Sequence, residues 1–270
     1  ICTYSGGKDS DVMLELFKRS GVPFEVHNSH TTVDAPPTVY HIRGTFRELE
    51  LAGITCDIDY HRQLDGHFLT MWNLIPQKLM PPTRTVRYCC KSLKEGYGAN
   101  RMIATGVRWA ESAQRRGREA FEYLASTKAG RIGASAEVML ANDNDTSRRL
   151  IEKCELKAKT VCNPIIDWKD SDVWEFYWHE CKRHNPLYQM GYTRVGCIGC
   201  PLAGISKRRK EFADFPTYGR AYKRAFEKMM QVRREKGLQT DNWETGEDVF
   251  RWWMNDRNIE GQLSMFDEVE

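Results

Sequence analysis

The feature that most constrains the fold is a short glycine-containing loop near the start of the 270-residue chain. A short, apolar, β-favouring segment precedes this loop, and apolar residues at helical spacing follow it. The loop consists of Ser5, Gly6, Gly7, Lys8, Asp9 and Ser10. Two glycines allow a close backbone approach, successive amides form a concave anion-binding surface, and the following helix adds its dipole. The segment therefore predicts a phosphate-binding loop between a strand and a helix.

Two better-known nucleotide loops do not fit this spacing. The Gly-x4-Gly-Lys-Ser/Thr pattern and the Gly-x-Gly-x-x-Gly pattern are both missing at residues 5–10. The other reading of Gly6-Gly7 is a tight turn without ligand. The lysine and the two serine hydroxyls in the same loop favour anion binding.

Strand-like segments alternate with helix-like segments along most of the chain. Strands are expected at 1–4, 24–29, 54–60, 102–107 and 160–166, and helices at 12–17, 39–49 and 170–177. We expect Asp170 or Ser171 to cap the last of these helices. This alternation predicts an α/β fold with a mainly parallel, twisted sheet and helices on both faces.

Composition divides the chain into two parts. Residues 1–205 carry the α/β pattern and are expected to form a nucleotide-binding domain, with a polar insertion at about 113–156 that holds a short helix near 146–154. Residues 206–270 are expected to form a basic helical C-terminal region and tail. Within them, residues 207–236 contain eleven basic and four acidic residues. This excess favours DNA or RNA as a partner, and the alternative is a solvated helical face. Its aromatic residues are expected to pack inward.

Four of the nine cysteines form a metal-like pattern. Cys89 and Cys90 are adjacent, and Cys197 and Cys200 form a Cys-x-x-Cys pair. Adjacent cysteines chelate one small ion poorly, whereas the separate irons of a cubane accept them, so the pattern favours a [4Fe–4S] cluster. A zinc site and unrelated thiols remain as alternatives.

The cellular setting is expected to be cytoplasmic. Unpaired cysteines without a visible secretory signal are typical of a reducing compartment. No apolar stretch approaches the roughly 18 residues that a membrane span needs, so no membrane association is expected.

The loop resembles the SGGxDS loop of ATP pyrophosphatases, a group that includes the phosphoadenosine phosphosulfate (PAPS) reductases. Further segments that resemble this family in order are 31–34, 37–40, 87–91, 105–108, 163–168, 172–174, 185–188 and 196–197. The resemblance implies an adenine nucleotide alpha hydrolase-like fold and a nucleotide contact through Gly106 and Arg108. The adjacent cysteine pair with a distant Cys-x-x-Cys resembles the cluster pattern of the APS-reducing branch.

The resemblance implies ATP or a related adenine nucleotide as ligand, with Mg²⁺. Lys8, Asp9, Asp34 and Arg108 are the candidate catalytic residues. Asp34 is the candidate for orienting Mg²⁺, because a hard carboxylate suits that ion. Arg108, with Arg87 as a second candidate, is expected to stabilise developing negative charge.

One departure from the reductases shapes the functional hypothesis. Reductases of this family use a cysteine near the C-terminus, whereas the last cysteine here is Cys200. We therefore expect adenylation followed by sulfur insertion, with a sulfur donor such as a cysteine desulfurase, as in the family's DNA phosphorothioation proteins. The alternatives are an APS or PAPS reductase that uses an external thiol and a non-catalytic nucleotide-binding partner in a complex.

The segment Gln262–Phe266 resembles the short peptide by which bacterial proteins bind the DNA sliding clamp. Its three apolar residues, Leu263, Met265 and Phe266, are the expected anchors. The alternative is that they fold back onto the chain.

Overall fold

A computed structural model describes residues 1–63, 65–94, 97–98, 101–111, 115–124, 159–240 and 243–255. The chain forms two compact units that interleave along the sequence. Unit 1 comprises Ile1–His30, Asp34–Tyr60 and Lys94–Gly196, and unit 2 comprises Thr31–Val33, His61–Leu93 and Cys197–Glu270. The single domain boundary that we expected after residue 205 does not divide these two units, because unit 2 takes residues from both sides of it. The expected helix at 146–154 and the Gln262–Phe266 segment lie outside the described residues.

Unit 1 is built on a six-stranded, mainly parallel sheet, which confirms the predicted α/β fold. The strand order among the described residues is β3-β2-β1-β4-β6-β5. These strands are β1 (Cys2–Thr3), β2 (Val26–Ser29), β3 (Cys56–Asp59), β4 (Met102–Ala104), β5 (Phe121–Leu124) and β6 (Lys159–Cys162). The register pairs Cys2 with both Val26 and Ala104, so β1 lies between β2 and β4.

Only β5 runs antiparallel, pairing with β6 at the edge of the sheet. This strand falls inside the segment that the sequence suggested to be an insertion. Its Phe121 and Tyr123 are exposed, and the strand has only four residues, so this short alternation stands out little from the polar segment around it. The strand was therefore not apparent from the sequence.

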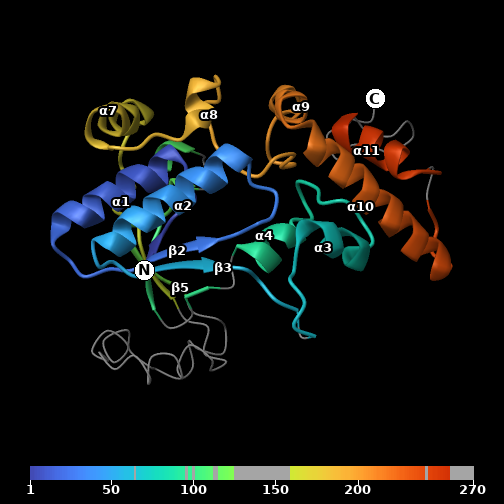
Figure 1. Ribbon diagram of the computed structural model, residues 1–270, viewed down its shortest axis with the longest axis horizontal. Helices are drawn as coiled ribbons and strands as arrows, with labels where there is room; N and C mark the ends of the chain where they lie inside the picture. Colours follow the sequence, from blue (N-terminus) through green and yellow to red (C-terminus); the bar gives the residue numbers. More distant parts are fainter. Residues whose placement is uncertain are drawn as a thin grey trace, which may run out of the picture. The chain divides into compact units, whose positions relative to one another are not determined.

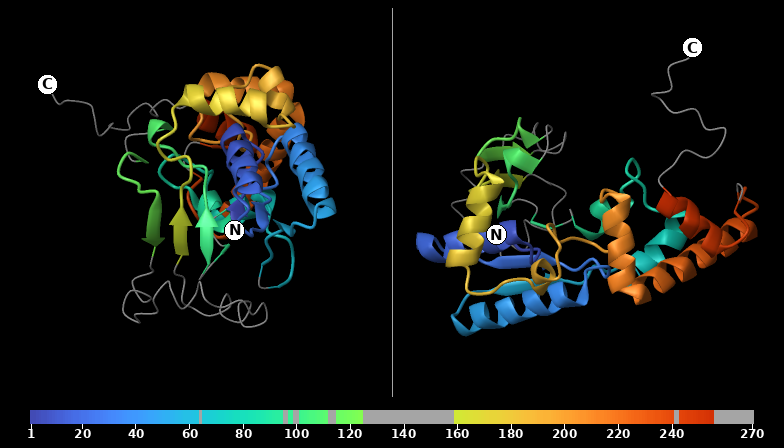
Figure 2. Two further views of the ribbon diagram at one scale, coloured as in Figure 1. Left: turned by 90° about the vertical axis from the view of Figure 1, so that its left-hand side faces the viewer. Right: turned by 90° about the horizontal axis from the view of Figure 1, so that it is seen from above.

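Helices α1 (Lys8–Ser20) and α2 (Pro36–Leu51) follow the first two strands and lie on the same side of the sheet (Figure 1 and Figure 2). Right-handed crossovers from β1 to β2 and from β2 to β3 require this placement. The apolar residues of α1 divide between two cores: Met13 and Leu14 face the sheet, whereas Val12 faces α7 (Asp170–Glu180). The short helices η1 (Trp109–Glu111) and α8 (Pro186–Gln189) complete the described helices of unit 1.

Unit 2 is helical. Its described elements are α3 (Met71–Lys78), α4 (Tyr88–Leu93), α9 (Ile205–Asp214), α10 (Pro216–Glu235) and α11 (Gly246–Asn255). Tyr222, Phe226 and Met229 of α10 are buried in the centre of its core. As expected, Tyr222 and Phe226 of the basic stretch pack inward, and Phe212 packs against the same core. Phe215 and Tyr218 are half-buried. No helix in the described part of the chain is long and apolar enough to cross a membrane.

Candidate functional site

The glycine-containing loop connects β1 to α1 at the point where the strand order reverses. Strands β2 and β3 lie on one side of β1, and β4, β6 and β5 lie on the other. In open α/β sheets, ligands bind outside the carboxyl ends of the strands at such a point. The topology therefore places the loop where this fold class binds its ligand.

Two glycines in this region are required by their surroundings. Gly6 has φ +71°, and a Cβ atom added there would lie 2.8 Å from Cγ1 of Ile42. A Cβ atom on Gly106 would lie 3.1 Å from the main-chain carbonyl oxygen of Asp9. The first glycine lets the loop turn against α2, and the second lets the turn after β4 approach the start of α1.

The hydroxyl of Ser10 organises the loop from inside. Its Oγ donates to the Gly7 carbonyl at 2.8 Å and accepts from the amides of Gly7 at 3.1 Å and Ser5 at 3.3 Å. The Lys8 amide donates to Oη of Tyr188 at 2.7 Å. Three loop amides thus donate hydrogen bonds to hydroxyl oxygens. An anion bound in the loop would accept hydrogen bonds from such amides in the same way.

The charged residues at the loop form one compact network. The Lys8 ammonium lies 3.0 Å from Asp9 and 3.2 Å from Asp170. Arg108 donates through Nε to Asp9 at 2.7 Å and through Nη2 to Asp170 at 2.9 Å. Lys8 and Arg108 are both buried, with 6% and 2% exposure. The structure thus brings together three predicted site residues, Lys8, Asp9 and Arg108, and adds Asp170, which we had considered only as a helix cap.

The helix that carries Asp170 begins differently from our expectation. The N-cap of α7 is Lys169, whose amide donates to Oδ2 of Asp172 at 2.9 Å. Asp170 is therefore the first residue inside the helix. Its side chain makes no capping hydrogen bond and contacts Lys8 and Arg108.

A further arginine extends the positive character of the region. Burial lowers the pKa of Arg115, and repulsion from Arg194 lowers it further. Arg108 and Arg118 contribute in the same direction, whereas Asp9 opposes them. Several cations therefore lie within electrostatic reach of one another, and Glu111 and Glu122 pair with three of them.

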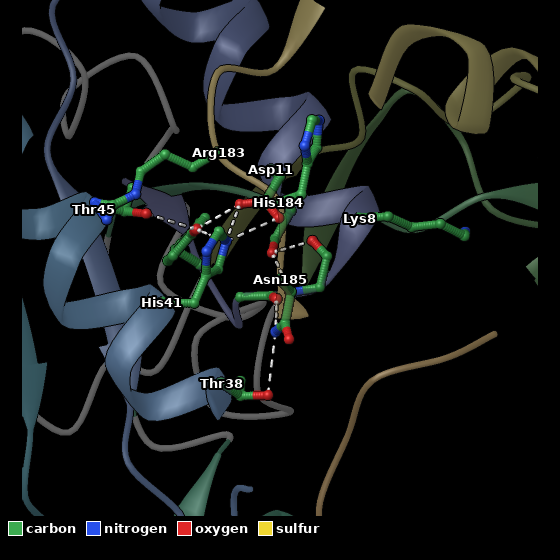
Figure 3. Close-up of polar contacts among 12 residues, drawn as sticks. Lys8, Asp11, Thr38, His41, Thr45, Arg183, His184 and Asn185 are labelled. Atoms are coloured by element: carbon green, nitrogen blue, oxygen red, sulfur yellow. Dashed lines mark hydrogen bonds and ion pairs between the residues drawn. The ribbon is translucent and has the colours of Figure 1, made fainter. Parts of the chain in front are cut away.

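Asn185 holds the loop from the opposite side and is completely buried. Its Nδ2 donates to the Gly6 carbonyl at 2.7 Å and to Oγ1 of Thr38 at 3.1 Å (Figure 3). Its Oδ1 accepts from the Leu187 amide at 3.0 Å and so caps α8. One amide side chain thus joins the loop, α2 and α8. Sequence reasoning treated this Asn-Pro pair as a common turn signal.

A buried polar network lies in the core beside the loop. Asp11 accepts from Tyr4 Oη, and His41 Nε2 lies 3.0 Å from Oδ1 of Asp11 (Figure 3). Tyr4 Oη also contacts Oγ1 of Thr45 at 3.2 Å. Burial and the neighbouring Asp11 raise the pKa of Tyr4. Figure 3 shows the Lys8 side chain extending away from this network. The network therefore fixes α1 to α2 while the charged end of the loop points elsewhere.

The remaining predicted loop-side residue, Asp34, is half-buried in unit 1 and immediately precedes the N-cap of α2. Its role in orienting Mg²⁺ stays a prediction. Arg87 is exposed and belongs to unit 2, where it precedes α4.

All four cysteines of the predicted cluster belong to unit 2. Cys89 and Cys90 lie in the first turn of α4. A hydrogen bond with Cys90, then burial, then the proximity of Cys90, Cys197 and Cys200 raise the pKa of Cys89. Cys89 is therefore within electrostatic reach of the other three sulfurs, although the two cysteine pairs are more than 100 residues apart in sequence.

The Cys197–Cys200 turn is held firmly by α9 and α10. Gly199 has φ +71°, and a Cβ atom there would lie 2.7 Å from the Phe212 ring. The Gly199 amide donates to Oε2 of Glu211 at 2.8 Å, and Tyr222 Oη donates to the Ile198 carbonyl at 3.0 Å. The turn is thus fixed by its main chain, and the Cys197 thiol itself donates to Oγ1 of Thr31 at 3.5 Å.

The fit of these cysteines to a metal group depends on the group. Within the described ranges, no three or more His, Cys, Asp or Glu side chains are arranged to hold a single metal ion. The described cysteines, these four included, form no disulfide. Four thiols from one adjacent pair and one Cys-x-x-Cys turn form the donor set of a cubane cluster, in which each sulfur binds a separate iron. The donor set matches that of a cluster by residue type, and the [4Fe–4S] cluster stays a prediction.

The fold and the loop together define an α/β nucleotide-binding protein of the phosphate-loop type. The family model described as "Phosphoadenosine phosphosulfate reductase domain" matches residues 1–203. The chain belongs to this family.

Individual relatives match over different lengths. An uncharacterized protein of Methanocaldococcus jannaschii is 24% identical over 245 residues, which cover 87% of this chain and 41% of that protein. The adenosine 5'-phosphosulfate reductase of Allochromatium vinosum is 42% identical over 41 residues, which cover 15% of this chain and 16% of that enzyme. The matches thus span less than half the length of either relative.

A solved structure of a PAPS reductase from Candida auris, a phosphate complex, aligns with a TM-score of 0.44 at 14% identity. The alignment covers 72% of this chain and 79% of that one.

Proposed function

We propose that this protein binds ATP through the Ser5–Ser10 loop and adenylates an acceptor for sulfur insertion. An acceptor oxygen would attack the α-phosphorus, the bond from that phosphorus to the bridging oxygen would break, and pyrophosphate would leave. A sulfur nucleophile, supplied by a donor such as a cysteine desulfurase, would then displace AMP. This reaction belongs to the cytoplasmic setting that the sequence predicts.

The observation that carries the proposal is the pair of buried cations at the loop. Lys8 and Arg108 are fixed by ion pairs at the carboxyl end of β1, where a pyrophosphate leaving group would need its charge stabilised. Because both cations are desolvated and already oriented, little reorganisation accompanies charge development. Asp9 holds both side chains, and Ser10 holds the loop. Asp34 would hold Mg²⁺, which would supply positive charge to the phosphates.

The thiols of unit 1 support adenylation rather than reduction by the chain's own cysteine. Burial raises the pKa of Cys2 and of Cys181 to about 12. Burial likewise raises the pKa of Cys56 to about 12 and that of Cys162 above its ordinary value. A thiolate is the nucleophilic form, so burial makes these described cysteines weaker candidates for the nucleophile.

Unit 2 would hold a [4Fe–4S] cluster through Cys89, Cys90, Cys197 and Cys200. Such a cluster supplies one-electron chemistry when bound. The protein's own contribution is the rigid Cys197–Cys200 turn and the placement of the adjacent pair at the start of α4.

A nucleic acid is the acceptor class that the charge of unit 2 supports. Arg220, Arg224 and Lys228 are exposed and recur every four residues along α10, so they share one helix face. Residues 207–236 would therefore bind a phosphate backbone. The Gln262–Phe266 segment would bring the enzyme to the DNA sliding clamp.

The acceptor proposal has a direct test. Replacing Arg220, Arg224 and Lys228 by Gln should weaken DNA or RNA binding and reduce the slope of log K against log salt by about 0.7–0.9 per charge removed. Lys182→Gln, an exposed lysine of unit 1, is the control and should leave the slope unchanged. Equal slopes for all three proteins would exclude this face as the nucleic-acid surface.

A second candidate function is an APS or PAPS reductase that takes its thiol from another protein. The identity with the Allochromatium vinosum enzyme favours it. The two candidates differ in their products, because adenylation releases pyrophosphate from ATP and reduction releases sulfite from APS or PAPS.

The decisive experiment uses protein purified without oxygen and assays both products. We expect pyrophosphate from ATP, with a loss of roughly 100-fold or more in Asp9→Asn because the contacts to Lys8 and Arg108 weaken together. Asp65→Asn, an exposed carboxylate of unit 2, should retain the activity. Sulfite from APS or PAPS with added thiol, and no pyrophosphate from ATP, would establish the reductase instead.

A further inference from the structure

Asp170 occupies an unusual place for a carboxylate. Its Oδ1 atom alone contacts both cations of the loop, at 3.2 Å from Nζ of Lys8 and 2.9 Å from Nη2 of Arg108. A negatively charged oxygen between these two donors is the arrangement that a phosphate oxygen would make with them. The carboxylate thus takes the part of an anion at the site.

The three side chains differ greatly in exposure. The side chains of Lys8 and Arg108 are 7% and 3% exposed, whereas that of Asp170 is 63% exposed. The cations are therefore fixed inside unit 1, and the carboxylate approaches them from the solvent side. Partial burial alone would raise the pKa of Asp170, but Lys8 and Arg108 outweigh it and lower that pKa. Asp170 is therefore charged near neutral pH.

Asp9 has a different relation to the same cations. It is the residue next to Lys8 in the loop, its side chain is 27% exposed, and it contacts Nε of Arg108. Phosphate binding can leave Asp9 in place, because Nζ of Lys8 has three donors and the guanidinium has five. The Asp170 carboxylate, in contrast, contacts both cations from the solvent side. It would therefore repel a phosphate group that approached the same cations.

We propose that Asp170 is a displaceable counter-ion that holds Lys8 and Arg108 in the nucleotide-free protein and competes with phosphate for them. It would act as a specificity-determining residue, because only a ligand with enough negative charge, such as a pyrophosphate group, displaces it. The inference rests on the proposed function, since it assigns phosphate binding to the same two cations.

The location of Asp170 makes the displacement mechanically simple. It is the first residue of α7, beyond the Lys169 N-cap, and the backbone of the helix start is held by Asp172 rather than by Asp170. Rotation of the Asp170 side chain therefore breaks no capping bond. Within the described part of the chain, the Trp174 indole also donates to Oδ2 of Asp170 at 3.2 Å, and this bond would break on rotation.

The test is isothermal titration of inorganic pyrophosphate into the full chain, with and without Mg²⁺. Asp170→Asn keeps the side-chain shape and removes the charge, and we expect it to bind pyrophosphate about tenfold more tightly than the unchanged protein, which corresponds to about 1.4 kcal/mol. A residue with only a structural role would weaken binding when replaced, so a gain distinguishes the two roles. Glu175→Gln is the matched control, because it removes one charge from an exposed position of the same helix and should change the affinity less than about twofold.

The outcomes separate this inference from the proposed function. Tight binding by the unchanged protein with equal or weaker binding by Asp170→Asn overturns the counter-ion role and leaves the phosphate site standing. Weaker binding by Asp170→Asn only with Mg²⁺ assigns Asp170 to the metal and overturns the inference as well. No pyrophosphate binding by the unchanged protein overturns both.

Discussion

Two glycines allow the effect of a steric clash to be separated from the effect of backbone conformation. Gly6 lies in the phosphate loop, and Gly21 is the C-cap of α1. Gly6 and Gly21 both have positive φ angles, of 71° and 70°. An added Cβ atom would meet Ile42 at Gly6 but nothing within 4 Å at Gly21. The two positions therefore share the left-handed conformation and differ in the space around it.

Alanine at these two positions should have unequal effects. Gly21→Ala should cost only the left-handed penalty, about 1–2 kcal/mol in the free energy of unfolding. Gly6→Ala should cost about 1–3 kcal/mol more, since α2 must shift, and should weaken pyrophosphate binding more than about tenfold. Thermal unfolding and titration measure the two effects. Equal destabilisation without a change in affinity would mean that the loop tolerates a side chain.

At the scale of elements, the short helix α8 connects the loop to the rest of unit 1. Asn185 caps this helix and bonds the Gly6 carbonyl with the same side chain. Asn73 of unit 2 is a suitable control for Asn185, because it also forms a hydrogen bond at a helix start. Its Oδ1 accepts from the Thr70 amide at 2.8 Å at the start of α3.

Replacement of Asn185 by Ala should destabilise unit 1 by on the order of 3 kcal/mol, because several buried groups lose their partner. It should also weaken pyrophosphate binding, because Gly6 loses its anchor. Asn73→Ala should cost about 1 kcal/mol, as other lost caps do, and should leave binding unchanged. Denaturant unfolding with titration would show the difference, and unchanged binding in Asn185→Ala would contradict the anchoring role.

Helix α9 carries a buried acid that gives unit 2 a pH dependence. Burial raises the pKa of Glu211 above its ordinary value of 4.5, although the Gly199 amide and Lys207 act in the opposite direction. In the window from 4.5 up to the raised folded-state pKa, the folded protein binds more protons than the unfolded chain. The free energy of unfolding therefore falls as the pH rises through this window.

Glu211→Gln should remove that slope, because the amide keeps an acceptor for the Gly199 amide and does not titrate. Urea midpoints measured from about pH 4.5 to 8 would reveal it, since the unchanged protein should lose stability with rising pH more steeply than the variant. Parallel curves would show that Glu211 ionises normally.

For the whole molecule, the four candidate cluster ligands come from two separated stretches of unit 2, His61–Leu93 and Cys197–Glu270. A bound cluster would cross-link these stretches, so its loss should destabilise unit 2 while unit 1 keeps its sheet. The proposed cluster can therefore be tested by the unfolding midpoint of unit 2 as well as by spectroscopy.

Anaerobically purified protein should contain about four irons and four sulfides per chain. Cys200→Ser should lose most of the iron and lower the unfolding midpoint, whereas Cys56→Ser, a half-buried cysteine of unit 1, should keep the iron. Iron analysis with thermal unfolding would test this. Zinc at one ion per chain, or iron retained in Cys200→Ser, would contradict the cluster.

The amino-acid sequence by itself determined the α/β fold, the position of the phosphate loop and the family. These are local properties: strand and helix periodicities, and glycines next to a lysine, are written within a few residues. Strand β5 was missed because it has only four residues within a polar segment. The inward packing of Tyr222 and Phe226 was also predictable, because they recur at helical spacing.

Only the tertiary structure decided which groups surround the loop. Asp170 and Asn185 reach Lys8, Arg108 and Gly6 across more than 60 residues. The sequence marked Asn185 only as part of a segment that resembles the family and Asp170 only as a possible helix cap, and neither pattern predicts these contacts. The gathering of Cys89 with Cys197 has the same character. Such contacts arise when the sheet order and helix packing bring distant segments together, so their identity depends on long-range packing that local sequence patterns do not encode.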